Sequence, residues 1–173
     1  MAKESFFIRA SITQNGVTFT QASIDLGAFV DALDRNILRI KQITAIWSDG
    51  NGVPLNPATN LTLAANSSQA LGWQLTTQSQ SSMVEATDRS KIASGSYVVG
   101  TGASSAVTAL TQAQDMNVDQ YANGYLIGVE QIYVGFDAVG NAGDSTATVN
   151  LVLECEVTKL TAAASMALAL SQQ

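Results

Sequence analysis

The strongest constraint on the fold is a strict alternation of residues near the C-terminus. In the stretch TATVNLVLECEVTKL the residues at 149, 151, 153, 155 and 157 are all apolar, and asparagine and glutamate stand between most of them. A period of two is that of a β-strand with one face in a core. We therefore expect a long strand here. Its register makes Cys155, the only cysteine, a buried and unreactive thiol.

Comparable apolar segments, separated by turn residues, recur along the chain. The segments at residues 5–12 and 17–24 flank Asn15-Gly16, which predicts an N-terminal β-hairpin. Further strands are expected at residues 37–47, 61–65, 71–77 and 125–136, with shorter candidates between 83 and 99. The strand at 125–136 is expected to pair antiparallel with the last strand. The total is about eight strands.

Two segments change to a helical period. Residues 26–33 place Leu26, Phe29, Val30 and Leu33 three and four apart, and Asp25 precedes them as a capping residue. We expect a short crossover helix there. Residues 160–173 are rich in Ala, Leu and Met and predict a C-terminal helix. Residues 104–124 are compatible with one or two helical turns or with a long surface excursion.

Strands that outnumber helices in this way predict an all-β protein, with a single eight-stranded jelly-roll sandwich as the leading topology. A chain of 173 residues holds one well-buried core. We expect residues 1–159 to form that domain and residues 160–173 to form a helical tail. An isolated helix of this length is marginal. The tail must therefore pack on its own domain, which we favour, or on a partner.

Composition excludes several classes of function. The net charge is −6 and only 8 residues are Lys or Arg, so direct nucleic-acid binding is not expected. Residues 1–4 lead directly into a strand pattern, so we expect no signal peptide. The apolar stretch at 162–170 is shorter than the roughly 20 residues of a membrane span, which predicts a soluble protein.

The sequence contains little that supports catalysis. Histidine is absent, so the usual metal clusters and the Ser-His and Cys-His pairs lack a member. Residues 49–53 resemble the start of a calcium loop but lack its later ligands, and we interpret them as a turn. Two carboxylate pairs remain as candidates for acid-base catalysis. Glu154 and Glu156 share a strand face, and Asp31 and Asp34 lie on the predicted short helix. A solvated sheet face explains the glutamates better than a glycosidase does. We expect no enzymatic activity, cofactor or small-molecule substrate.

A binding module is the alternative class. Six aromatic residues are candidates for a platform on a carbohydrate-binding or adhesin-like sandwich, although most of them also suit a core. They are Trp47, Trp73, Tyr97, Tyr121, Tyr125 and Tyr133.

One family resemblance points to the other class. The run SIDLGAFVDALDRNILRIKQITAIWSDGNG at residues 23–52, the hairpin before it and the late strand VNLVLECEVTKL resemble a group of viral capsid proteins. These are the small single-jelly-roll major capsid proteins of tailless icosahedral viruses with an internal membrane, the Thermus-phage and haloarchaeal-virus lineage.

The resemblance implies a structural protein of the virion, made in the host cytoplasm. Such a subunit self-associates, pairs with a larger sister capsid protein and builds a shell over the internal membrane. It implies no catalytic residues. The apolar side chains of the tail are our candidates for contact with a neighbouring subunit or with the membrane: Leu160, Met166, Leu168 and Leu170.

Overall fold

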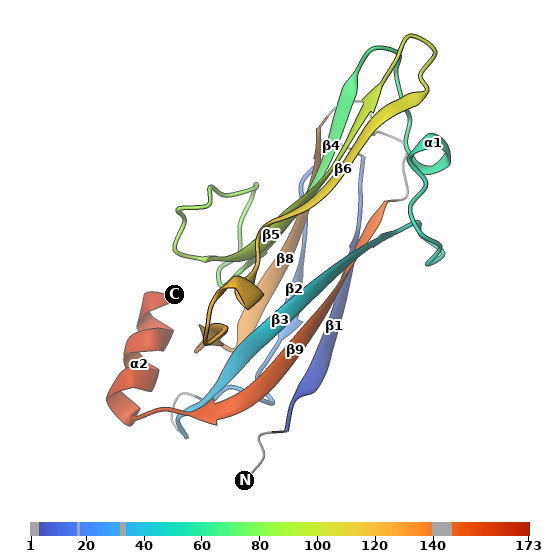
Figure 1. Ribbon diagram of the computed structural model, residues 1–173. Helices are drawn as coiled ribbons and strands as arrows, with labels where there is room; N and C mark the ends of the chain where they lie inside the picture. Colours follow the sequence, from blue (N-terminus) through green and yellow to red (C-terminus); the bar gives the residue numbers. More distant parts are fainter. Residues whose placement is uncertain (1–3, 17, 32–33, 140–146) are drawn as a thin grey trace.

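Two antiparallel β-sheets lie face to face in the computed structural model, which describes residues 4–16, 18–31, 34–139 and 147–173 (Figure 1). The strands are β1 Phe6–Thr13, β2 Thr20–Asp25, β3 Asn36–Ser48, β4 Ser68–Thr76, β5 Lys91–Thr101, β6 Val107–Met116, β7 Tyr125–Ile127, β8 Gln131–Val139 and β9 Thr148–Lys159. The helices are α1 Pro57–Asn60, the 3-10 turn η1 Val118–Gln120 and α2 Ala162–Ser171.

The strand order is that of a jelly roll with one additional strand. One sheet has the order β1-β9-β3-β7 and the other β2-β8-β4-β5-β6. Consecutive strands alternate between the sheets except where β4, β5 and β6 follow one another in the same sheet. The predicted all-β sandwich is confirmed. The described residues contain nine strands, against a prediction of about eight, and β6 lies in a segment that we expected to be helical or irregular.

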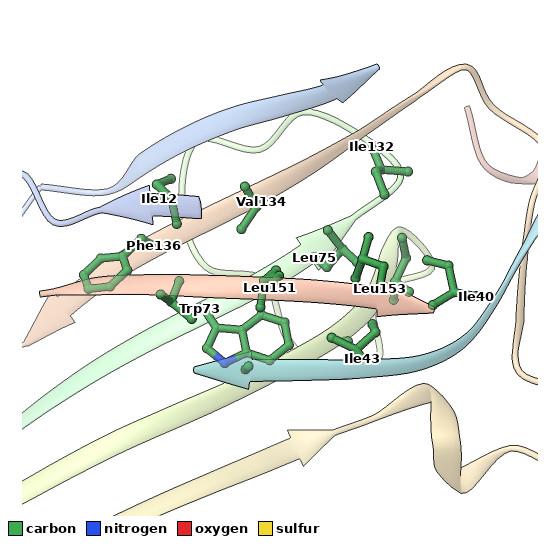
Figure 2. Packing of buried hydrophobic residues seen from close by; sticks show 14 of the residues in the cluster. Ile12, Ile40, Ile43, Trp73, Leu75, Ile132, Val134, Phe136, Leu151 and Leu153 are labelled. Atoms are coloured by element: carbon green, nitrogen blue, oxygen red, sulfur yellow. The ribbon is translucent and has the colours of Figure 1, made fainter. Parts of the chain in front are cut away.

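The core fills the space between the sheets, with Trp73 of β4 and Phe136 of β8 as its largest fully buried side chains (Figure 2). The alternation in β9 is confirmed over most of its length, because Val149, Leu151, Leu153 and Cys155 are completely buried. The exception is Val157, near the end of the strand, which is 40% exposed.

A β-bulge explains an irregularity in the sequence of β3. Its members of the core cluster between the sheets are Leu38 and Ile40 before the bulge and Ile43, Ala45 and Trp47 after it. The positions change from even to odd numbers, which an uninterrupted strand cannot place on one face. The pairing with β9 shifts between Ile40 and Gln42, so Lys41 is the extra residue and both halves of β3 face the core.

Two predicted strand pairings are wrong. The chain turns at Asn15–Gly16, where Gly16 has a φ of 61° and Asn15 bridges Thr18. However, β1 then pairs with β9 and β2 with β8, so the two strands belong to different sheets and form no hairpin. Val17, part of the predicted second strand, lies outside the described residues. The expected pair of final strands is divided in the same way, since β8 pairs with β2 and β4 while β9 pairs with β1 and β3.

The predicted crossover helix at 26–33 is a single turn. Asp25 caps it as expected, with its Oδ1 accepting from Gly27 N–H at 2.9 Å, and Val30 N–H donates to the Leu26 carbonyl at 3.0 Å. One turn already buries both Leu26 and Val30. Immediately afterwards, Asp31 and Asn36 exchange two backbone hydrogen bonds at the start of β3, which ends the helical geometry. Residues 32–33 of the prediction lie outside the described residues.

Three other segments differ from expectation. Residues 61–65 form no strand, the predicted strand at 125–136 is interrupted between β7 and β8, and the candidates between 83 and 99 yield one strand, β5. Residues 77–90 form a loop that covers the outer face of β4. The Gln74 side chain, completely buried, donates to the Ser82 carbonyl and accepts from Val84 N–H.

The Cys155 thiol is expected to be unreactive in the native protein. Burial, assisted by the charge of Glu154, raises the pKa of the thiol to about 12 from an ordinary value of 9.0. Ellman's reagent should therefore label it at neutral pH only after unfolding in guanidinium chloride. The contribution of this thiol to stability is constant below pH 9 and falls as pH rises toward 12, since only the unfolded chain ionises in that interval. Rapid labelling of the native protein would contradict the buried position.

Candidate functional site

The C-terminal helix is confirmed in outline and lies beside the sandwich (Figure 1). It begins after Thr161, whose side chain accepts from Ala164 N–H at 3.3 Å, and ends at Ser171. Residues 160–173 contain no charged side chain. A helix that is apolar on nearly every side is normally covered on more than one side. The part of α2 that faces away from its own domain is therefore the first candidate for a contact surface.

Gln172 anchors the end of α2 to the connection between β7 and β8. Its side chain accepts from Gly128 N–H at 2.8 Å and donates to the Leu126 carbonyl at 2.7 Å. A Cβ at position 128 would lie 3.1 Å from both the Ala169 nitrogen and Leu168 Cγ, so glycine permits this close approach. Sequence reasoning missed both Gln172 and Gly128.

The structure divides the four predicted interface residues into two pairs. Met166 and Leu170, one helical turn apart on α2, are 61% and 69% exposed. Leu168 is half-buried against Gly128, and Leu160 is half-buried where its N–H donates to the Arg35 carbonyl at 3.1 Å. Met166 and Leu170 thus form the free apolar surface of the tail, while Leu160 and Leu168 help to hold it in place.

A groove of about 810 Å³ runs between α2 and the segment before β7. Its walls include Leu168 from α2, Tyr121 and Tyr125 from the other side, and Arg89 from the loop at 77–90. Among the described residues, Arg89 and the two tyrosines are the only ionisable side chains that line it. Burial raises the pKa of Tyr125, which keeps that phenol protonated. The groove therefore offers apolar and hydrogen-bonding surface but no pair of groups for acid-base catalysis.

The carboxylate pair of β9 is held in ion pairs across the outer face of the four-stranded sheet. Glu156 lies 3.3 Å from Arg39 and is 5% exposed, and Glu154 lies 3.7 Å from Lys41. Each glutamate is thus matched by a cation on β3, which is what a structural sheet face requires.

The turn at residues 49–53 is also structural. The Asp49 carboxylate accepts from the N–H groups of Asn51 and Val53, both at 2.8 Å. Within the described ranges, no group of three metal-ligating side chains comes together. No helix in the described part of the chain is long and apolar enough to cross a membrane.

The six aromatic candidates do not form an exposed platform. Trp47, Trp73 and Tyr97 are buried core residues, and Trp47 packs against both Tyr97 and Phe136 with ring centroids 5.6 and 5.7 Å apart. Tyr121 is exposed, whereas Tyr125 and Tyr133 are only half-exposed. The carbohydrate-binding alternative thereby loses both of its tryptophans.

Comparison with known proteins supports the jelly-roll fold. The chain is similar to VP1 of Trichodysplasia spinulosa-associated polyomavirus, solved in complex with sialylated precision glycooligomers. The TM-score is 0.50 and the identity 11%, over 90% of this chain and 95% of that one. The fold is a jelly roll. Apo chimpanzee polyomavirus VP1 gives the same TM-score at 6% identity, over 91% of this jelly roll and 96% of the VP1 chain.

The similarity of this jelly roll to VP1 is one of fold alone, at identities this low. No protein-family model matches the sequence, and no curated protein matches it. The likeness is to viral proteins, as the sequence resemblance had implied. It does not test the internal-membrane lineage, which stays a prediction.

Proposed function

We propose that this chain is a structural capsid subunit that self-associates to build a viral shell and has no catalytic role. The observation that carries the proposal is the jelly-roll strand order. The structural similarity to two VP1 capsid proteins covers nine tenths of this chain and nearly the whole length of each VP1 chain. A sandwich of this kind presents broad flat sides and open sheet edges to its neighbours. Repetition of such contacts produces a closed shell.

The surface chemistry supports an assembly role. Charged residues make up 13% of the chain and hydrophobic residues 46%, so that the exposed surface is polar but weakly charged. Several large apolar side chains remain at least half exposed, among them Phe7 on the four-stranded sheet and Leu110 on the five-stranded sheet. Interface centres are similarly depleted of charge. Glu154 and Glu156, the carboxylate pair considered for catalysis, are each engaged in an ion pair with a cation of β3.

The finer parts of the proposal come from the sequence resemblance. They are a larger sister capsid protein as partner, a shell over an internal membrane, a location in the virion and synthesis in the host cytoplasm. The free apolar surface of α2, Met166 and Leu170, is the proposed point of contact with the sister protein or the membrane.

Sedimentation velocity over a wide concentration range tests the subunit role, with and without a co-expressed larger capsid-like protein. We expect concentration-dependent dimers or larger species, alone or with that partner. A monomer under every condition would refute the proposal and favour the binding module.

Substitution of the exposed tail surface tests the site. The double variant Met166→Gln/Leu170→Gln should weaken association with the sister protein by about tenfold or more, because exposed apolar anchors carry a large share of interface energy. Ala163→Gln, at an exposed position of the same helix, is the matched control. Flotation with phosphatidylcholine vesicles measures the membrane alternative with the same variants. If the double variant behaves as wild type in both assays, the tail is not the contact surface.

A further inference from the structure

Strand β6 is an open edge of the five-stranded sheet. It pairs with β5 on one side, and within the described residues no strand pairs with its other side. Seven of its ten residues are exposed, and the others, Val107, Ala113 and Met116, are half-buried. Because side chains in a strand alternate between faces, this pattern means that both faces of β6 lie largely uncovered. The backbone N–H and C=O groups along its outer side have no partner strand among the described residues.

The centre of this edge lacks the features that normally prevent strand pairing, because the pairing of β6 with β5 is irregular only near its two ends, before Ala109 and after Ala113. Proteins protect open edges with lysine, proline, bulges or very short strands. The sequence of β6, VTALTQAQDM, contains neither proline nor a basic residue, and its first eight residues carry no charge. Leu110, near the middle, is 52% exposed. A strand of this kind in an unpaired state is prone to association.

The other three edge strands are better protected. β7 has three residues. β1 carries Arg9 near its centre. In β2 the Gln21 side chain is engaged with the loop at 77–90, donating to Ser79 Oγ and accepting from Gln80 N–H. Among the described edges, β6 is therefore the long one that is open to another strand.

We propose that β6 pairs antiparallel with β6 of a second copy of this chain, about a two-fold axis near Thr111 and Gln112. Two identical strands in antiparallel order are self-complementary, so each edge supplies the partner that the other requires. The pairing would join two five-stranded sheets into one continuous sheet of ten strands. This inference rests on the proposed self-association and identifies the surface responsible for it.

The charge distribution of β6 suits this arrangement. Asp115, the single charged residue of the strand, lies one position from its C-terminal end. Antiparallel pairing about the centre places the two Asp115 side chains at opposite ends, where like charges do not face each other. The central residues Thr108, Thr111, Gln112 and Gln114 are uncharged hydrogen-bonding side chains. A parallel pairing would instead bring the carboxylates side by side.

A lysine substitution in the strand tests the proposal. Leu110→Lys places a charge on the edge and should weaken self-association by about tenfold or more in sedimentation velocity. Ile46→Lys is the matched control, because Ile46 is also a strand residue and is 51% exposed, but it lies in β3 inside the other sheet. Far-UV circular dichroism verifies that both variants fold. If Leu110→Lys associates as wild type does, the β6 interface is refuted while the capsid role stands.

Disulfide cross-linking provides an independent measurement. Cys155 is buried, so a single introduced cysteine is the only accessible thiol in the described residues. Opposed residues of an antiparallel pair have Cα atoms about 4.5–5.5 Å apart, within the range of a disulfide. Thr111→Cys and Gln112→Cys bracket the axis, and at least one should form a covalent dimer under mild oxidation, whereas Thr44→Cys should not. Equal cross-linking at Thr44 would refute the assignment. If the wild-type chain remains monomeric throughout, the proposed function fails as well.

Discussion

Replacement of Trp73 by alanine is expected to lower the free energy of unfolding by about 3–5 kcal/mol, as for other large buried aromatic residues. Trp73 is 1% exposed and lies opposite Phe136 in the β4–β8 ladder, at the middle of the sandwich (Figure 2). Its ring also occupies the space beside Gly95, where a Cβ would come within 2.5 Å of Trp73 Nε1. The surrounding strands cannot close the resulting cavity without moving both sheets.

Urea denaturation followed by far-UV circular dichroism measures this loss. Protein concentration must be low and fixed, because self-association adds to apparent stability. Tyr121→Ala, an aromatic residue that is 44% exposed, is the control and should cost less than about 1 kcal/mol. If both variants lose the same small amount, Trp73 does not have the central position described.

Gly124→Ala is expected to lower the free energy of unfolding by about 3 kcal/mol or more, which is a large loss for the addition of one methyl group. Gly124 has a φ of 64°, and a Cβ there would lie 2.2 Å from the Ile40 carbonyl oxygen. That oxygen belongs to the backbone of β3 and cannot rotate away. The substitution therefore displaces the segment that pairs β7 with β3 and lines the groove beside α2.

Gly52→Ala separates the clash from the backbone cost. Gly52 also has a positive φ, 83°, but no atom lies within 4 Å of the place that a Cβ would occupy there. It should lose only the left-handed conformational penalty, about 1 kcal/mol. Thermal or urea unfolding of the two variants then gives the steric contribution by difference. If both variants lose the same free energy of unfolding, Gly124 does not approach the Ile40 carbonyl of β3 as closely as described.

The period of the sequence determined the sheet faces but not the strand partners. Val149, Leu151 and Leu153 of β9 are buried as predicted. Alternation states which side of a strand is buried, and it contains no information on which strand lies alongside. The hairpin was predicted from the Asn15-Gly16 turn between two strand patterns, whereas the chain sends β1 and β2 to opposite sheets.

Three further features depend on how much of a strand other segments cover or on its irregularity. Alternation puts Gln74 on the face opposite to Trp73, and it contains no sign that the loop at 77–90 buries this side chain and satisfies its amide. β6 was missed for the opposite reason, since a strand exposed on both faces shows no apolar alternation. The bulge at Lys41 left a visible signal, the change of parity between Ile40 and Ile43, which separate treatment of the two half-strands would have found.

The sequence predicted the candidate site as a helix and favoured its packing on the domain, but it did not predict the contacts that dock it. Composition identified residues 160–173, and the exposure of Met166 and Leu170 agrees with a contact surface. The anchoring by Gln172 depends on one backbone group in β7 and one in the connection after it, both far away in sequence. No local pattern reveals a partner of that kind.

The position of β9 between β1 and β3 determines when the chain is able to fold during synthesis. Three of the four strands of that sheet precede residue 128, yet their central member is made last, at residues 148–159. Until β9 has left the ribosome, β1 has no neighbour in its sheet, and the edge of β3 that pairs with β9 is open. Long-range pairing of this type is slow and exposes sticky surface in the meantime. The nascent polypeptide therefore needs β9 to reach the native fold. A chain that is truncated just before β9 cannot complete the four-stranded sheet and cannot enter an assembly.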